Sequence, residues 1–230
     1  ANQGHEEVVS QLLVASPMLI NAVGLDGSTA LHSAACKGHE KVMSQLLAVA
    51  NPTLLDAADH YGRTALHCAA NGGREKVVSQ LLAVASPAMI NTVTDSGWTA
   101  LHCAILNEHE QMVFQLLAVA SPELINAVDL ENRTALDLAA AEGHDKVVSQ
   151  LLATKPTLTN EFFPFFHDSR TTLGAAIIKG DDKVASQLVV AIPPTLLHLS
   201  DGYGDTALHL AVKEGREKIV SQLLKVATPA

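Results

Sequence analysis

The sequence repeats a single unit from one end to the other, and this limits the folds that are open to it. The unit is clearest in residues 62–82, which read GRTALHCAANGGREKVVSQLL. Self-similarity with a period of a few tens of residues is typical of a stacked array, in which each copy buries its apolar face against its neighbours. The Thr-x-Leu signature returns at intervals of 35, 35, 35, 37 and 35 residues, beginning at Thr29, Thr64, Thr99, Thr134, Thr171 and Thr206.

The first half of each unit predicts a helix and a tight turn. In the second repeat the helix runs from about Thr64, whose hydroxyl can cap free backbone N–H groups, to Asn71. Gly73 then fits the left-handed conformation that ends a helix. Glu108 stands at this position in the third repeat, and we expect a less stable turn there.

The second half of the unit predicts another helix and a projecting finger. The helix runs from about Glu75 to Ala85 and carries an apolar stripe on one side. We expect Pro87 to stop it, because the proline ring excludes further helix. The residues that follow are expected to form a β-hairpin or extended finger, which turns at Ser96-Gly97.

The run Thr64-Ala65-Leu66-His67-x-Ala69-Ala70, followed by Gly73 and by Val77-Val78-x-x-Leu81-Leu82, resembles the ankyrin repeat. The resemblance covers essentially all 230 residues, although the family has Pro where this chain has Ala65 and its period is about 33 residues. It implies an all-α solenoid of helix-turn-helix units joined by β-hairpin-like fingers. It also implies a protein-binding scaffold without catalysis.

We expect one array over residues 1–230. It contains a partial repeat at 1–27, repeats that start near residues 28, 63, 98, 133, 170 and 205, and an irregular connection at 153–169. The chain begins in the second half of a unit and stops where a further connection would start. We therefore expect the array to be truncated at both ends and to belong to a longer protein.

Composition and charge narrow the range of partners. Asp and Glu number 24 against 15 Lys and Arg, a net charge of -9, whereas a nucleic-acid binder presents a basic surface. No apolar run approaches the ~18 residues of a membrane span, and the first residues lack a signal-peptide pattern. We expect a soluble, cytoplasmic monomer that binds no nucleic acid, cofactor or metal. We expect Cys36, Cys68 and Cys103 to be reduced, with a reactive or metal-binding role as the alternative.

Two columns of polar residues recur at fixed positions of the unit. Repetition marks them as architecture, so no catalytic residue is expected among them, and the resemblance implies that the histidines hold neighbouring turns together by hydrogen bonds. They are His32, His67, His102 and His209. We expect the glutamines to form side-chain hydrogen bonds between repeats, with a binding stripe as the alternative. They are Gln11, Gln45, Gln80, Gln115, Gln150, Gln187 and Gln222.

Residues that differ between units are the candidates for partner recognition. The position before each repeat's Thr holds Ser28, Arg63, Trp98, Arg133, Arg170 and Asp205. Trp and Arg are enriched at interface hot spots, and Arg can bind a carboxylate through two hydrogen bonds. The alternative is that the arginines pair with acidic residues at the base of the finger, such as Asp59 or Asp129.

The resemblance implies that the finger tips and the exposed face of the first helix line a concave groove. We predict that repeats two to four bind an extended or helical protein segment with acidic groups, with Trp98 as anchor between Arg63 and Arg133. Further candidates are His60, Tyr61, Asp95, Leu130 and Glu131 at the tips, and Asn71, Leu106 and Asn107 on the first helix.

The irregular connection holds four of the five phenylalanines, Phe162, Phe163, Phe165 and Phe166. Either they fill a groove between the fourth and fifth repeats, or they form a second recognition patch.

Near-identity of Lys-Val-Val-Ser-Gln-Leu-Leu in successive units indicates recent internal duplication. This is compatible with a bacterial effector that acts on a host protein in the host cytoplasm, or with a cytosolic adaptor. Another alternative is the substrate-recruiting segment of an enzyme whose catalytic domain lies outside this chain. A third is an architectural spacer.

Overall fold

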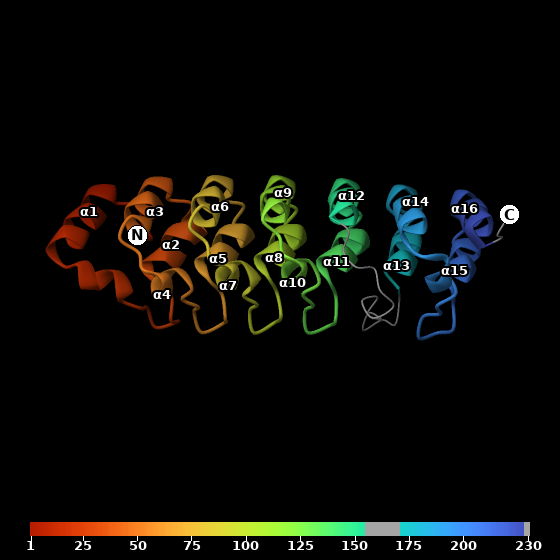
Figure 1. Cartoon of the computed structure of the whole chain (residues 1–230), viewed down its shortest axis with the longest axis horizontal. Helices are drawn as coiled ribbons and strands as arrows, with labels where there is room; N and C mark the ends of the chain where they lie inside the picture. Colours follow the sequence, from red (N-terminus) through yellow and green to blue (C-terminus); the bar gives the residue numbers. More distant parts are fainter. Residues whose placement is uncertain (155–170, 228–230) are drawn as a thin grey trace. The chain divides into compact units, whose positions relative to one another are not determined.

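The computed structural model describes residues 1–154 and 171–227, and the chain divides into two compact units, residues 1–127 and 128–230. Helices account for the regular structure of both (Figure 1). Those of unit 1 are α1 (Glu6–Ala15), η1 (Pro17–Asn21), α2 (Ala30–Lys37), α3 (Glu40–Leu47), α4 (Pro52–Leu55), α5 (Ala65–Asn71), α6 (Glu75–Leu82), α7 (Pro87–Asn91), α8 (Ala100–Leu106), α9 (Glu110–Ala118) and α10 (Pro122–Ile125). Those of unit 2 are α11 (Ala135–Glu142), α12 (Asp145–Ala153), α13 (Thr172–Lys179), α14 (Asp182–Ala191), η2 (Pro194–Leu196), α15 (Ala207–Lys213) and α16 (Glu217–Ala227).

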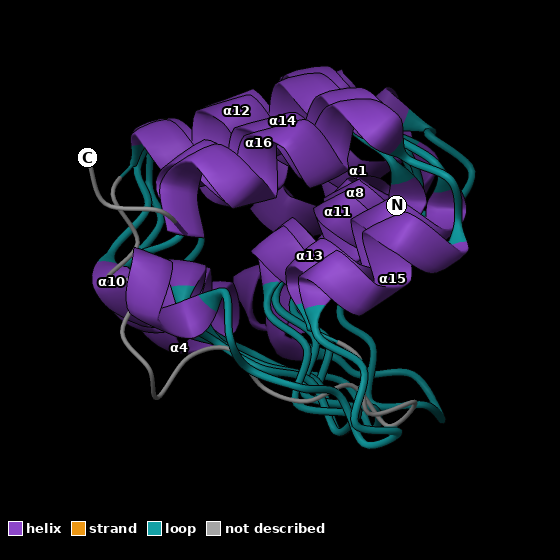
Figure 2. Cartoon of the chain, turned by 90° about the vertical axis from the view of Figure 1, so that its right-hand side faces the viewer, coloured by secondary structure: helices purple, strands orange, loops and turns teal. Residues whose placement is uncertain are grey.

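Each unit is built from two layers of helices. In unit 1 the first helices of the repeats, α2, α5 and α8, pack side by side, and so do the second helices, α3, α6 and α9 (Figure 1). In unit 2, α11, α13 and α15 form one layer and α12, α14 and α16 the other (Figure 2). Fully buried alanines such as Ala69 and Ala139 allow neighbouring first helices to approach closely.

The first helices begin as the sequence predicts. Thr99 precedes α8, and its hydroxyl accepts a hydrogen bond from the backbone N–H of His102 at 3.3 Å, while its own N–H donates to His102 Nδ1 at 3.2 Å. This reciprocal arrangement is a capping box, which satisfies two of the N–H groups that a helix start leaves free. The helix predicted from about Thr64 to Asn71 is α5, which spans Ala65–Asn71.

The turns between the paired helices confirm the role of Gly73, which has a φ of +67°. Glu108 at the equivalent position also adopts the left-handed conformation, with a φ of 60°. A side chain with a Cβ is strained in this region of conformational space, whereas glycine is not. The third repeat therefore keeps the turn at an energetic cost.

The segment after each second helix differs from the prediction. The helix expected to reach Ala85 ends at Leu82, and Pro87 begins a new short helix, α7, where an extended finger was expected. The interpretation of Pro87 as a helix stop was wrong, because a proline in the first turn of a helix forfeits no hydrogen bond. Ser86 caps α7 by accepting the N–H of Met89 at 3.0 Å.

The finger proper is shorter than expected and follows α7. Its turn lies at the predicted place, since Thr94 N–H donates to Trp98 O at 2.9 Å and Gly97 N–H to Thr94 O at 2.8 Å. Within residues 1–154 and 171–227 the fingers form no strand, and one isolated bridge joins Ser200 and Thr206. The predicted hairpins are therefore tight loops.

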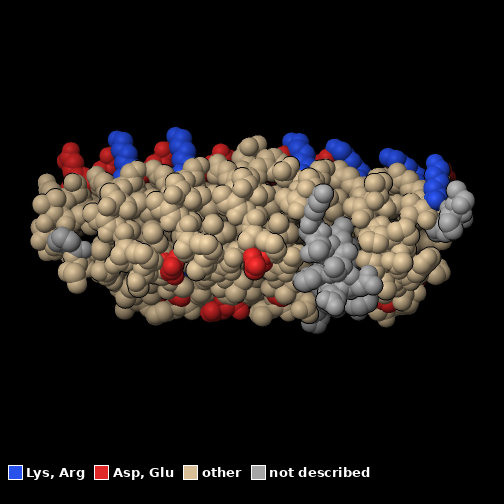
Figure 3. Space-filling model, viewed as in Figure 1, with Lys and Arg blue, Asp and Glu red and all other residues tan. Residues whose placement is uncertain are grey.

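Ion pairs link the second helices of successive repeats on the outer surface. Lys41 Nζ lies 3.2 Å from Glu6 Oε2, Lys76 Nζ lies 3.3 Å from Glu40 Oε1, and Lys183 pairs with Asp145. In the view of Figure 3, Lys and Arg side chains gather along the edge formed by the second helices. These pairs are exposed, so each contributes little to stability.

Candidate functional site

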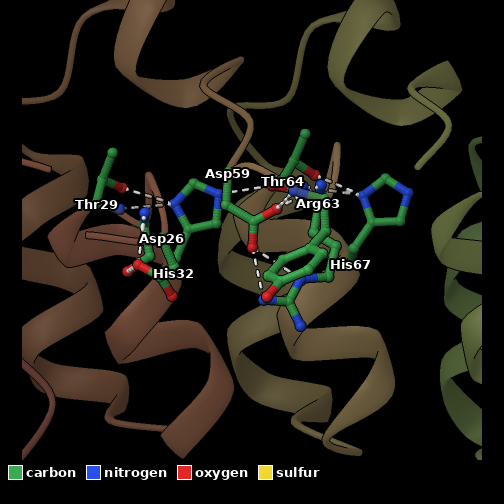
Figure 4. A network of polar contacts seen from close by, with 9 residues as sticks. Asp26, Thr29, His32, Asp59, Arg63, Thr64 and His67 are labelled. Carbon is green, nitrogen blue, oxygen red and sulfur yellow. Dashed lines mark hydrogen bonds and ion pairs between the residues drawn. The ribbon is translucent and has the colours of Figure 1, made fainter. Parts of the chain in front are cut away.

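The finger of the second repeat is organised around the buried carboxylate of Asp59 (Figure 4). One oxygen, Oδ1, accepts the backbone N–H groups of Tyr61 and Arg63 at 2.9 Å each. The other, Oδ2, accepts Arg63 Nε at 2.7 Å and lies 2.6 Å from its Nη2. Burial alone raises the pKa of Asp59, but these hydrogen bonds from Arg63 and Tyr61 outweigh it and lower the pKa below its ordinary value.

Asp129 organises the finger of the fourth repeat, in unit 2, in the same way. Its Oδ1 accepts the N–H groups of Glu131 and Arg133 at 2.9 Å each, and its Oδ2 accepts Arg133 Nε at 2.8 Å. Arg133 also lies 2.9 Å from Glu131 Oε2, and its side chain is only 22% exposed.

Arg63 and Arg133 therefore pair with Asp59 and Asp129, which was the alternative to a role in partner binding. The two arginines differ in what they leave for a partner. Two carboxylates meet the charge of Arg133, whereas the Arg63 side chain is 43% exposed and lies over the ring of Tyr61, 4.9 Å from its centroid.

Sequence reasoning missed the organising role of the acidic residue itself. An Asp stands five residues before the repeat's Thr in the second, fourth and sixth repeats, as Asp59, Asp129 and Asp201. Asp201 Oδ1 likewise accepts two backbone N–H groups of its finger, at 2.9 Å each. In the third repeat Thr94 replaces it and accepts the N–H of Trp98 at 3.1 Å. The constant spacing of five residues between these positions and the Thr of each repeat could have indicated this role from the sequence.

Backbone hydrogen bonds join successive fingers of unit 1. His60 N–H donates to Asp26 O at 2.9 Å, and Asp95 N–H donates to Tyr61 O at 3.1 Å. The predicted tip residues His60, Tyr61 and Asp95 are thus brought side by side on a fixed base, and all three are exposed. Trp98 is partly exposed.

The predicted first-helix residues of unit 1 also come together. Asn107 Nδ2 donates to Asn71 Oδ1 at 3.1 Å, and both side chains are exposed, while Leu106 is partly covered. In unit 2 the tip residues Leu130 and Glu131 are exposed. Arg170 and the predicted second patch, Phe162, Phe163, Phe165 and Phe166, lie outside the described residues.

His32 and His67 perform the structural role that the family resemblance implied for the histidine column. His67 Nδ1 accepts the N–H of Thr64 at 3.2 Å, so its proton lies on Nε2, which donates to Trp98 O of the next repeat at 3.0 Å. His32 repeats the arrangement with Arg63 O, at 2.8 Å (Figure 4). Burial lowers the pKa of His67 to about 4, so the neutral ring persists at neutral pH.

Asp137 takes the place of this histidine in the fourth repeat. Its Oδ2 accepts the N–H and the hydroxyl of Thr134 at 2.8 and 2.7 Å, and its Oδ1 accepts the hydroxyl of Thr172 on α13 of the next repeat. The carboxyl thus caps its own helix and links two repeats, as His67 does. Burial raises the pKa of Asp137 to about 6, against the opposing effect of these hydrogen bonds.

Gly174 takes the histidine position in the fifth repeat. A Cβ placed on Gly174 would lie 2.9 Å from Leu210 Cδ1 of α15, so a side chain there would displace that leucine. Packing of Leu210 therefore replaces the polar link between these two repeats.

In the glutamine column, Gln80 forms hydrogen bonds to the preceding repeat. Its Nε2 donates to Ser44 Oγ at 2.8 Å and to Glu40 O at 3.2 Å, both on the second helix of the preceding repeat. The partners are a serine and a backbone carbonyl and not another glutamine.

The described ranges, 1–154 and 171–227, contain no group of three potential metal ligands and no helix that is long and apolar enough to cross a membrane. The polar clusters found there are engaged in capping and in links between repeats. The exposed, varied side chains of the finger tips and first helices are suited to contact another molecule.

Comparison with known proteins agrees with this architecture. The family model described as ankyrin repeats (3 copies) matches residues 1–92 and 79–161, and the model described as ankyrin repeat matches residues 203–229. Comparison with curated protein sequences gave no match. The ankyrin repeat domain of Bcl-3, a member of the IkappaB protein family, is similar in fold, with a TM-score of 0.78 and 24% identity over 97% of this chain and 95% of that one. An ankyrin repeat domain from Acinetobacter baumannii gives a TM-score of 0.72 and 24% identity, covering 86% of this chain and 98% of that one. The chain belongs to the ankyrin repeat family.

Proposed function

We propose that this chain is a non-catalytic scaffold that binds a partner protein through the fingers and first helices of its repeats. Ankyrin repeats generally serve as protein–protein interaction scaffolds. The proposal rests on the backbone hydrogen bonds from finger to finger, which hold in place the main chain that carries the exposed His60, Tyr61 and Asp95. A preorganised surface of this kind loses little conformational entropy on binding.

The proposed surface of unit 1 combines aromatic side chains with a partly exposed guanidinium group. Trp98 and Tyr61 supply large, stiff side chains, and Arg63 supplies positive charge that its ion pair with Asp59 leaves partly exposed. The partner is a segment with acidic groups that lies across the second and third repeats. Asn71, Leu106 and Asn107 form the edge of this surface on the first helices.

Arg133, Leu130 and Glu131 are the candidate binding residues of the fourth repeat, which belongs to unit 2. Leu130 is 76% exposed and offers an apolar contact, whereas Arg133 serves mainly to hold its own finger in shape. We assign Arg133 a smaller share of the binding energy than Trp98 for this reason.

The binding of a partner is compatible with three biological roles. A cytoplasmic adaptor, a bacterial effector in the host cytoplasm, and the recruiting segment of a larger enzyme all require the same binding step. They differ in the identity of the partner and in what lies beyond these residues.

Capture of a partner from cell lysate tests the proposal. The bait is the wild-type chain, beside a Tyr61→Ala/Trp98→Ala variant and a Tyr203→Ala control, which removes an exposed tyrosine at the same finger position in unit 2. We expect a captured protein to be retained by the wild type and the control and lost by the double variant. Trp98→Ala alone should cost on the order of 2 kcal/mol of binding.

Circular dichroism of each bait establishes that it is folded, and the bond from His67 uses the backbone of residue 98, which the substitution leaves in place. A partner that binds the folded double variant as tightly as the wild type would contradict the proposed surface. Failure of every bait to retain a partner would favour the architectural spacer.

A further inference from the structure

Two cysteines of unit 1 lie on adjacent first helices. Cys36 is exposed near the end of α2, and Cys68 is buried on α5, which packs directly against α2. The ionisation of each thiol is affected by the other. The surrounding backbone is also close, because a Cβ placed on Gly72 would lie 3.1 Å from Cys36 O and 3.4 Å from Cys68 O. Arg74 Nε donates to Cys36 O at 3.2 Å and ties the end of α2 to the second repeat.

The surroundings give the two thiols different chemical characters. Interaction with the Cys68 thiol, together with the positive charges of Arg63, Lys37 and Arg74, lowers the pKa of Cys36 well below that of an ordinary thiol. Interaction with Cys36 and burial raise the pKa of Cys68. These shifts favour the thiolate form of the exposed Cys36 and the protonated form of the buried Cys68.

Cys103 provides a built-in comparison. It occupies in the third repeat the position that Cys68 occupies in the second, and burial raises its pKa to about 11. In the second repeat, which precedes the repeat of Cys103, the position of Cys36 is occupied by Asn71. Cys103 therefore has no thiol at the place where Cys68 has Cys36. The sequence therefore places the pair once, between the first and second repeats.

We propose that Cys36 and Cys68 form a redox pair, which a hydroperoxide converts into a disulfide between the first two repeats. The Cys36 thiolate attacks the peroxide, the O–O bond breaks, and the products are a sulfenic acid on Cys36 and, after protonation, water or an alcohol. The Cys68 sulfur then attacks the sulfenic sulfur, the S–O bond breaks, and the hydroxide leaves with the Cys68 proton as water. Two thiols are oxidised and one peroxide is reduced.

This inference is independent of the proposed partner, because both thiols belong to the chain itself. It gives Cys36 and Cys68 the reactive role that was the alternative to three reduced, unreactive thiols. Cys36 reacts first, Cys68 resolves the product, and Cys103 takes no part.

Hydrogen peroxide and mass spectrometry test the pair on the full chain. After brief treatment we expect the wild type and Cys103→Ser to lose the mass of two hydrogen atoms, and digestion without reductant to yield one cross-linked peptide pair containing Cys36 and Cys68. Dithiothreitol should restore the original mass. Cys36→Ser should stay unmodified, and Cys68→Ser, which mimics Ser33 at the same position of the first repeat, should gain one oxygen that dimedone traps.

The rate of alkylation by iodoacetamide as a function of pH supplies a second measurement. We expect Cys36 of the wild type to react with an apparent pKa at least about one unit below the ordinary ~8.5 of a thiol, and Cys68→Ser to move that value upward. The inference would be overturned by a wild-type chain that keeps Cys36 and Cys68 as free thiols in peroxide. A cross-link through Cys103, or oxidation of Cys36 to the sulfonic acid without a cross-link, would overturn it as well.

Discussion

Asp137 and His67 occupy the same position of the repeat, yet they respond to pH in opposite directions. Burial lowers the pKa of His67 to about 4, so the stability that its neutral ring contributes is lost as the pH falls. Asp137 has a pKa raised from 3.8 to about 6, so it binds its proton more tightly in the folded chain. The stability from Asp137 is therefore fully present below pH 3.8 and is lost as the pH rises through about 6.

Asp137→Asn removes this dependence while keeping an oxygen to accept from Thr134 and an amide to donate to Thr172. Relative to the wild type, the variant should gain about 2 to 3 kcal/mol of unfolding free energy between pH 4 and pH 7. Urea unfolding at several pH values measures the difference. A difference between the two proteins that stays constant over this range would refute the assignment.

Glu108 offers a stabilising substitution. Its φ of 60° strains a residue with a Cβ, and its side chain is exposed, so Glu108→Gly should raise the unfolding free energy by about 1 kcal/mol. Asn132→Gly, at a φ of 57°, is the matched control and should gain less, because asparagine tolerates this conformation. Unchanged or lower stability of the Glu108 variant in urea would speak against strain at this turn.

At the residue scale, the helix caps and turns that recur in every repeat could be predicted from the sequence. The side-chain contacts within the fingers could not. The cap at Thr99, the turn at Gly73 and the exception at Glu108 follow from local backbone rules and were predicted. The pairing of Arg63 with Asp59 remained one of two alternatives, because sequence alone does not show whether a guanidinium reaches a carboxylate four residues away. The exchange of His for Asp137 was missed because its partner Thr172 lies in another repeat.

The short helices α4, α7 and α10 are the elements that sequence reasoning did not foresee. Their signal was present as Asn51-Pro52, Ser86-Pro87 and Ser121-Pro122, since an N-cap residue followed by proline starts a helix as readily as proline stops one. The longer helices were predicted because each carries an apolar stripe at helical spacing, and a four- or five-residue helix is too short to show one.

Ser86→Ala tests how far these short helices support the array. The Ser86 hydroxyl accepts the N–H of Met89 and donates at 2.7 Å to Oδ1 of Asp56, the C-cap residue that follows α4 of the preceding repeat. Loss of both bonds should lower the unfolding free energy by about 1 to 2 kcal/mol. Ser96→Ala, at an exposed finger tip, should change it by less than about 0.5 kcal/mol. Equal effects of the two substitutions in thermal or urea unfolding would show that the cap is dispensable.

For the molecule as a whole, the buried apolar interior of each unit outweighs its surface charges. The ion pairs between second helices are exposed, with side-chain exposures of 77% and 42% for Lys41 and Glu6, and salt screens such pairs. Raising NaCl from about 0.05 to about 0.5 M should change the unfolding free energy by less than about 1 kcal/mol. A larger loss of stability would mean that the ion pairs act as a cooperative network.

The continuity of the array was predicted from the repeat alone and stays a prediction. The period of 35 residues is broken once, by the interval of 37 residues between Thr134 and Thr171, which contains the connection with Phe162 and Phe166. Connections follow no repeat rule, so sequence periodicity carries no information about how they fold. The partner is unknown for the same reason, because recognition depends on the residues that do not repeat.

The bonds from His32 and His67 to the next finger end on backbone carbonyls, at Arg63 in one repeat and at Trp98 in the next. An arginine and a tryptophan therefore occupy the same position, and the side chain of neither residue takes part in the hydrogen bond from the histidine. Mutation at position 98 can change what the surface recognises while the fold is inherited unaltered. A library randomised there would consist largely of folded members, and duplication followed by a single change offers evolution the same route to a new specificity.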